Sequence, residues 1–368
     1  MTSESTPSQP EETRRLYHLR KWVLLTALLN FAGLIQGGAV TSTDSALVDP
    51  HWPSFEGEVV PSPSRMTDSW PLFFEHTHRI LMGSVGILTL ICTIAIWRST
   101  RRRDLRSTSR LALILVTIIA TMGGLTVLLG KSTWVSVIHV SLAMMYVLAM
   151  WKLVVLLGHE EPLPTEKSAA TKTLRILSTA AVHSIVLQVI LGAIPRHATQ
   201  EAGGRTLVLV GDGIHIAWAF AVFTLVILTY LEASKHYRPE RRVFRPAVGL
   251  VFLIVAQVFL GFAAFVVQPK DPPSVQDLYP ASAQANADAG GDGNEATPAS
   301  PAGEATTEVA AAPAPERKVA GQAERSHALT ASAHQVLGII ILITAWVLSL
   351  RVRRLTERPE APSESELT

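Results

Sequence analysis

Eight stretches of predominantly apolar residues follow one another along the chain, and the segments between them hold most of its charged residues. A helix needs about 20 such residues to cross the hydrocarbon core of a bilayer. The stretches cover residues 21–41, 72–97, 109–130, 134–157, 174–195, 208–232, 247–267 and 327–351. The pattern therefore predicts an all-α integral membrane protein with eight transmembrane helices.

The distribution of Lys and Arg predicts how these helices are oriented. One side of the membrane collects 23 of the 32 basic residues, in both terminal segments and in the connections after the second, fourth and sixth stretches. We expect that side to be cytoplasmic, with residues 1–20 and 352–368 as tails and 158–173 as a linker. The first stretch lacks an A-x-A-like cleavage site, so we interpret it as a retained helix and not a signal peptide.

Composition narrows the class of protein further. Hydrophobic residues make up 48% of the chain and charged residues 17%, where a soluble domain carries about 25% charge. These values argue against a soluble globular protein, a disordered protein and a coiled coil. The net charge of +2 gives no reason to expect a nucleic-acid partner. Cys92 is the only cysteine, which excludes an intramolecular disulfide, a Cys-rich zinc site and an iron–sulfur cluster.

The two halves of the chain resemble each other, which predicts two pseudo-symmetric four-helix bundles, residues 21–157 and 174–351. LIQGGAVTSTDS (34–45) and VILGAIPRHATQ (189–200) each place glycine near an outer end, before a polar loop. Both halves start on the same side, so the repeats would be parallel, about an axis along the membrane normal. Residues 42–71 should fold against the outer surface, and 269–325, rich in Ala, Pro, Gly and Ser, should be a disordered outer insertion.

One histidine lies near the outer end of every even-numbered stretch: His78, His139, His215 and His334. Alternate helices of an up-down bundle can lie diagonally opposite, so His78 would face His139, and His215 would face His334. Two imidazoles that face each other across a bundle core suit axial ligation of a haem iron. A lone intramembrane histidine often bonds a neighbouring helix instead, but four at matched depth favour haem ligation.

Charged residues accompany His78. Glu75 lies three residues before it, on the same helix face, and a carboxylate just inside an apolar bundle is usually functional. The plainer alternative is an acid favoured by the helix dipole. Arg79 could pair with a haem propionate or with lipid headgroups. His76 should point away from His78, and His51 lies in an outer loop where it could touch a substrate.

These residues and motifs resemble those of haem A synthases. EHTHR (75–79) is similar to the Glu-x-x-His-Arg motif of that family, and GGLTVLLGKSTWVSVIHVSLAM (123–144) to its third and fourth spans. GGAVTSTDSAL (37–47), GAIPRHAT (192–199) and HQVLG (334–338) resemble its first, fifth and eighth spans. The likeness covers nearly all of residues 20–351 apart from the insertion.

The resemblance implies an oxidoreductase that converts the C8 methyl of haem O to the formyl group of haem A by successive hydroxylations with water. It implies that His78 and His139 are the axial iron ligands of the substrate haem, and His215 and His334 those of a haem b. Glu75 would be catalytic, either stabilising a developing positive charge or positioning the attacking water. Arg79 would contact the haem.

The resemblance also implies a setting. The chain would be a multi-pass protein of the inner cell membrane with both termini cytoplasmic, would receive haem O from a haem O synthase, and would supply terminal oxidase assembly. Lipid is then a partner and nucleic acid is not, and a homo-oligomeric state stays open.

Three departures from the family pattern leave rival functions open. The first outer loop lacks the cysteine pair that many members carry, Ile216 stands where an arginine often follows the histidine, and the insertion 269–325 is unusual. One rival is a dihaem electron carrier of the cytochrome b561 kind, which would leave Glu75 without a role. The others are a non-catalytic haem-binding assembly or sensing protein, which the missing cysteines favour, and a transporter, for which midplane charges are missing.

Overall fold

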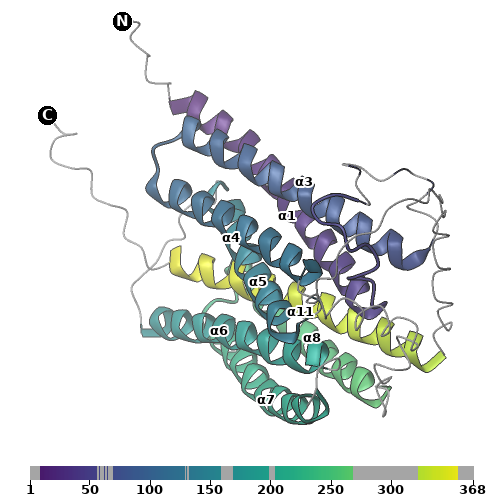
Figure 1. Ribbon diagram of the computed structural model, residues 1–368. Coiled ribbons are helices and arrows are strands. Elements are labelled where there is room, and N and C mark those ends of the chain that lie inside the picture. Colours follow the sequence, from purple (N-terminus) through teal and green to yellow (C-terminus); the bar gives the residue numbers. More distant parts are fainter. Residues whose placement is uncertain are drawn as a thin grey trace, which may run out of the picture. The chain divides into compact units, whose positions relative to one another are not determined.

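The computed structural model describes residues 9–55, 58, 62, 64, 69–128, 130, 132–158, 169–198, 204–267 and 322–354. Eight α-helices make up nearly all of this part of the chain, and no strand occurs in it (Figure 1). The helices are α1 (Gln9–Ser42), α3 (Trp70–Ser99), α4 (Arg103–Leu128), α5 (Thr133–Leu156), α6 (Ala169–His197), α7 (Gly204–His236), α8 (Arg241–Val266) and α11 (Gln322–Arg354). Each contains a segment long and apolar enough to cross a membrane.

The predicted all-α architecture with eight transmembrane helices is therefore confirmed. Large apolar side chains such as Phe220 and Phe252 are more than two-thirds exposed in the isolated chain, as expected of surfaces that face lipid instead of water. The protein is a multi-pass membrane protein.

The predicted helix boundaries are too narrow at several ends. Helix α1 begins at Gln9, within the predicted tail, and α11 begins at Gln322, within the predicted insertion. The prediction followed apolar content, whereas a helix continues into polar sequence wherever backbone hydrogen bonds and helix-forming side chains allow it. Most of the insertion 269–325, residues 159–168 of the linker and residues 355–368 of the C-terminal tail lie outside the described residues.

Helices α1, α3, α4 and α5 form the N-terminal bundle. Contacts join α1 to α3, α3 to α4, α4 to α5 and α5 back to α1, and α1 and α3 run side by side in Figure 1. In this closed ring α3 and α5 occupy diagonal corners. The helices that carry His78 and His139 therefore face each other across the bundle core.

Helices α6, α7, α8 and α11 form the C-terminal bundle. Contacts join α6 to α7 and α7 to α8. The amide of Gln257 on α8 donates to the backbone oxygen of His334 on α11 (3.0 Å), and the hydroxyls of Thr179 on α6 and Ser349 on α11 lie 3.4 Å apart. The ring closes as in the first bundle, with α7 and α11 diagonal. The two halves are thus pseudo-symmetric, as predicted.

The bundles meet along α5 and α6 and along α11. Helices α5 and α6 are in contact, and the indole N–H of Trp346 on α11 donates to the carbonyl of Leu148 on α5 (2.8 Å). At the other end of α11, the hydroxyl of Ser332 lies 2.8 Å from that of Ser42, at the end of α1.

The start of α3 is fixed by its own sequence. Ser69 has an extended backbone, and its hydroxyl accepts a hydrogen bond from the N–H of Leu72 (3.3 Å), with proline in the first turn. Serine is a preferred N-cap residue, and proline is tolerated in the first turn because the N–H groups there have no partner within the helix. This cap determines where the turns that carry Glu75 and His78 lie.

Candidate functional site

In the N-terminal bundle, each predicted histidine bonds a backbone carbonyl of the preceding helix. Nδ1 of His78 lies 3.1 Å from the carbonyl oxygen of Gly33, and Nδ1 of His139 lies 3.1 Å from that of Ile119. A carbonyl only accepts, so each Nδ1 carries the proton and each Nε2 has a free lone pair. Metal-binding histidines are typically oriented by a bond of this kind.

The C-terminal bundle repeats this arrangement. Nδ1 of His215 lies 3.1 Å from the carbonyl oxygen of Gln188. His334 occupies the corresponding place beside Gln257, although its Nδ1 has no hydrogen-bond partner within the described part of the chain.

A glycine packs against the ring of every one of these histidines. An ideal Cβ built on Gly37 would lie 3.1 Å from Cε1 of His78, and one on Gly123 would lie 3.4 Å from Cε1 of His139. The corresponding distances are 2.7 Å from Gly192 to His215 and 2.9 Å from Gly261 to His334. Each of these glycines lies four residues, or about one helical turn, after another residue that contacts the same histidine. The pairs are Gly33 and Gly37, Ile119 and Gly123, Gln188 and Gly192, and Gln257 and Gly261. We call this arrangement, which occurs four times, the glycine cradle. This recurrence supports the internal repeat.

The histidines come together in the two predicted pairs. The ring centres of His215 and His334 are 6.1 Å apart. Histidine nitrogens bind metals at about 2 Å, so two imidazoles that share one ion have ring centres about 6 Å apart. His78 and His139 are close enough to interact electrostatically. The donor set fits two haems, each with two axial histidines.

This fit involves only two protein ligands for each iron. Among the residues that the structure describes, no three His, Cys, Asp or Glu side chains gather as they would around a bare metal ion. A porphyrin supplies the remaining nitrogens itself, so two axial histidines suffice.

Two glutamines distinguish the C-terminal pair, and the sequence interpretation missed them. The side-chain nitrogen of Gln188 lies 3.3 Å from Nε2 of His215, and that of Gln257 lies 3.2 Å from Nε2 of His334. Both glutamine Oε1 atoms are buried and have no hydrogen-bond partner among the residues that the structure describes. The signal was visible as QVILG (188–192) and QVFLG (257–261). In the N-terminal half the same positions hold Gly33 and Ile119, which cannot place an amide there.

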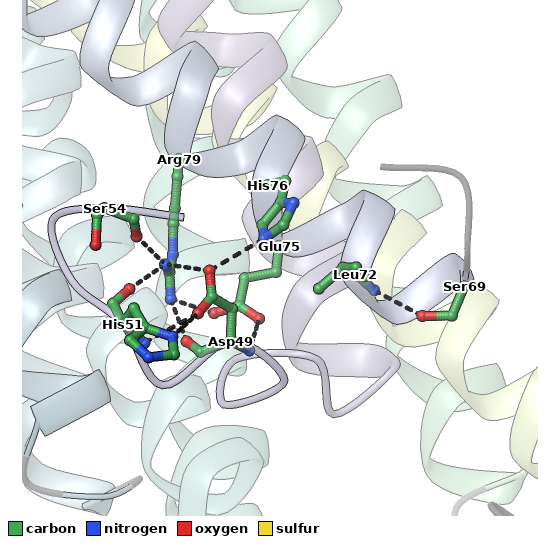
Figure 2. Close-up of polar contacts among 8 residues, drawn as sticks. All are labelled: Asp49, His51, Ser54, Ser69, Leu72, Glu75, His76 and Arg79. Carbon is green, nitrogen blue, oxygen red and sulfur yellow. Dashed lines mark hydrogen bonds and ion pairs between the residues drawn. The ribbon is translucent and has the colours of Figure 1, made fainter. Parts of the chain in front are cut away.

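Glu75 is buried, with 3% of its surface exposed, and both of its carboxylate oxygens are engaged. Oε2 accepts a hydrogen bond from the backbone N–H of Asp49 (2.9 Å), and Oε1 pairs with the guanidinium of Arg79 one turn along α3. Figure 2 shows the loop before α3 folding back so that Asp49 meets the helix beside Glu75. The carboxylate is therefore held in one orientation next to the turn of His78.

Arg79 binds this loop as well as Glu75. Its guanidinium donates to the carbonyls of Asp49 and His51 at 2.7 Å each and to that of Ser54 at 3.4 Å (Figure 2). It also lies 3.4 Å from the Asp49 carboxylate. The pairing of Arg79 with a haem propionate stays a prediction, while its contacts within the chain couple α3 to the loop.

Asp49 is a second buried carboxylate that the sequence interpretation missed. Its oxygens lie 2.9 Å from Nδ1 of His51 and 3.2 Å from Nε2 of His76. Burial raises the pKa of this carboxyl, but hydrogen bonds from His51 and the charge of Arg79 outweigh burial, so the pKa of Asp49 lies below its ordinary value. Asp49 is therefore an anion at neutral pH, and it holds the loop together.

The loop between α1 and α3 folds against the N-terminal bundle, and its aromatic residues contact α3 and α4. Phe55 packs edge-on against His76, with ring centres 4.9 Å apart. Carbon atoms of Trp52 lie within 2.7 Å of an ideal Cβ built on Gly124, so only glycine fits beneath the indole. His51, with 55% of its side chain exposed, lies at the outer edge of this cluster.

Comparisons with known proteins agree with this geometry. Residues 20–206, which make up half of the chain, match the family COX15-CtaA, described as cytochrome oxidase assembly protein. The matched segment contains α1 from residue 20 onward, all of α3, α4, α5 and α6, and the first residues of α7.

Several curated relatives are named heme A synthase. The protein from Alkalihalophilus pseudofirmus is 25% identical over 269 residues, which cover 67% of this chain and 87% of the relative. The protein from Bacillus licheniformis is 23% identical over 260 residues, 65% of this chain and 83% of the relative. The protein from Staphylococcus aureus is 24% identical over 259 residues, 66% of this chain and 84% of the relative. With the family match over half of its length, the chain belongs to the COX15-CtaA family of cytochrome oxidase assembly proteins.

Proposed function

We propose that this protein is a haem A synthase, an oxidoreductase that converts the C8 methyl group of haem O to a formyl group by successive hydroxylations. The observation that carries the proposal is the buried carboxylate of Glu75, held on both oxygens one turn from His78. A passive haem carrier needs axial ligands but has no use for a carboxylate oriented beside one of them. The relatives named heme A synthase support the same reaction.

The N-terminal bundle would hold the substrate. His78 and His139 lie on diagonal helices, and each Nδ1 bonds a carbonyl, so both Nε2 atoms are ready to bind iron from opposite faces of haem O. Glu75 shares the helix face of His78, so it can reach the macrocycle edge but not the iron. The cradles at Gly37 and Gly123 keep both rings in place.

Glu75 would act at the methyl carbon. Each carboxylate oxygen has one protein hydrogen bond and a second lone pair that is still available. That lone pair can accept a proton from a water molecule and direct its oxygen to the carbon, and the negative charge favours a cationic carbon. Because the carboxylate is already oriented and buried, little reorganisation is needed during the reaction.

The C-terminal bundle would hold a haem b between His215 and His334, and the iron would replace the Gln188 and Gln257 amides at the Nε2 lone pairs that they contact here. The bound haem b supplies one-electron redox chemistry. The protein's own contribution is to fix the two imidazoles 6.1 Å apart and to keep the site inside the bundle.

The setting follows from the same proposal. Basic residues concentrated on one side favour an inner-membrane protein with both termini in the cytoplasm. A haem O synthase would supply the substrate, and terminal oxidase assembly would consume the haem A. A homo-oligomeric state stays open, and nothing in the charge of the chain calls for nucleic acid.

Expression with a haem O source, followed by extraction and chromatography of the haems, tests the function. Haem A in the extract of the parent, together with its loss in Glu75→Gln, supports the synthase. Haem B alone would support an electron carrier or a haem-binding assembly protein. His215→Ala tests the ligand assignment, because it should remove the haem b spectrum while the N-terminal half still takes up haem.

A further inference from the structure

Arg196 lies where the outer ends of three helices from both bundles converge. It belongs to the last turn of α6, and its guanidinium donates to the hydroxyl of Ser42 (2.6 Å) and to the carbonyl of Gly38 (3.4 Å), both at the end of α1. Ser42 in turn lies 2.8 Å from Ser332 on α11. The cation is thus fixed between the C-terminal bundle and the first helix of the N-terminal bundle.

No carboxylate pairs with Arg196 within the described part of the chain, and the two oxygens to which its guanidinium donates are neutral. The residue is partly buried. A cation withdrawn from water is stable only when an anion or several hydrogen bonds replace its hydration. Two hydrogen bonds leave most of the five N–H donors of a guanidinium free, so the site can accept an anion.

The surroundings of Arg196 indicate which anion. Ser332, which lies 2.8 Å from the Ser42 hydroxyl that Arg196 contacts, is two residues before His334 on α11. The next residue, Gln335, has its side-chain oxygen 3.2 Å from an ideal Cβ on Gly38, the residue whose carbonyl Arg196 contacts. The cation therefore lies beside the turn that carries an axial ligand. Ile216 follows the opposite ligand, His215, so α7 offers no cation directly after its own ligand.

We propose that Arg196 binds a carboxylate of the haem held by His215 and His334, and that it does so while bonded to Ser42 of the other bundle. The inference rests on the proposed haem b in the C-terminal bundle. It assigns Arg196 as an anion-binding residue of that site. A carboxylate on Arg196 also joins the C-terminal haem to α1, the helix whose Gly33 and Gly37 hold His78. Occupancy of one haem site thereby stabilises a helix of the other.

The test compares haem b with haem b dimethyl ester, which has the same macrocycle and iron but no free carboxylate. The purified protein is loaded with either haem, and transfer to excess apomyoglobin is followed at the absorption band that His215→Ala abolishes. A hydrogen bond to a charged group contributes about 1.5–3 kcal/mol, so the parent should release the ester about 10–100-fold faster than haem b. Arg196→Gln should release haem b about as fast as the parent releases the ester, and it should leave the release rate of the ester unchanged.

Two further variants separate charge from structure. Arg196→Lys retains the positive charge and should keep most of the discrimination between the two haems. Arg353→Gln is the matched control, because Arg353 is also partly buried and donates to a hydroxyl, that of Thr179 (3.4 Å). It lies 19 residues after His334 on the same helix, about 28 Å away, and its substitution should leave the discrimination unchanged.

The outcomes are distinguishable. If Arg196→Gln still discriminates as the parent does, Arg196 does not bind the haem carboxylate and the inference is wrong. If Arg196→Gln accelerates the release of haem b and of the ester by the same factor, the residue has a structural role or binds a lipid phosphate, and the inference is again wrong. If His215→Ala retains the haem b band, the ligand assignment of the proposed function fails instead.

Discussion

The four glycines that pack against the histidine rings allow a graded test of the haem sites. Replacing each glycine by alanine adds one methyl group at a known distance from a ring atom. That distance is 2.7 Å at Gly192, 2.9 Å at Gly261, 3.1 Å at Gly37 and 3.4 Å at Gly123. Carbon atoms attract at 3.5–4.0 Å and repel at closer range. The predicted damage therefore decreases in that order.

The size of the effect follows from the rigidity of each ring. His215 is held at Nδ1 by a backbone carbonyl, so it cannot move away from a new methyl group without stretching that bond. Overpacking of this kind costs about 1–3 kcal/mol, which weakens haem binding about 5–100-fold. Gly192→Ala should lie at the upper end of this range. Gly123→Ala creates an ordinary contact and should bind haem like the parent.

Haem titration of the apoprotein, read as the Soret absorbance for each half of the molecule, measures these affinities. Gly249→Ala is the control, because Gly249 shares α8 with Gly261 but has no atom within 4 Å of an ideal Cβ. Alanine should only raise its helix propensity, by about 1 kcal/mol. Equal haem loss in Gly192→Ala and Gly249→Ala, or full haem affinity in Gly192→Ala, would refute the cradle argument.

Three other changes test the remaining parts of the site. Glu75→Gln should bind haem O but form haem A two to three orders of magnitude more slowly, as expected for loss of about 3–4 kcal/mol of electrostatic stabilisation. Single-turnover haem extraction measures this, with exposed Glu58→Gln as the control, and near-parental turnover contradicts a catalytic role. Asp49→Asn should lower stability by about 1–3 kcal/mol at pH 7. Because the pKa of Asp49 is lowered in the folded state, its contribution is complete above the unfolded pKa of about 3.9 and is lost as pH falls through the folded value, so the thermal stabilities of parent and variant should approach each other as the pH is lowered below the unfolded pKa. Deletion of residues 275–320 should preserve haem content, because a segment so rich in Ala, Pro, Gly and Ser predicts little buried apolar surface, and loss of both haems would show that it covers a site.

Hydropathy was sufficient to predict the eight helices, because a transmembrane segment must satisfy its backbone hydrogen bonds internally and present apolar side chains to lipid. The same criterion could not locate the helix ends. Residues 9–20 at the start of α1 are mostly polar and nevertheless helical. Hydropathy identifies the part of a helix that lies in the membrane, and it does not identify where the helix itself begins or ends.

The repeated histidines also allowed their pairing to be predicted, since alternate helices of a bundle ring are diagonal. The local chemistry around them was not predicted. The carbonyls that accept from the histidines and the packing of Gly192 against His215 depend on how far neighbouring helices are shifted along their axes. This axial register cannot be derived from the hydropathy pattern of a single sequence. Asp49 was missed for another reason, because its partners Glu75 and Arg79 lie across a loop whose path depends on those same contacts.

The ion pair between Glu75 and Arg79 has a consequence for how α3 enters the bilayer. The pair is spaced i, i+4 with the acid first, the order that favours pairing within a single helix. It can form as soon as this turn is helical, before the loop with Asp49 has docked. An unpaired acid or base costs about 2.5–3.5 kcal/mol at the centre of an inserting helix; Glu75 and Arg79 lie in the first third of α3, so this value is an upper bound on the penalty that each charge would meet if it were unpaired. The Glu75 carboxylate thus enters the membrane with its counter-ion on the same helix, and its neutralisation does not depend on the docking of the loop.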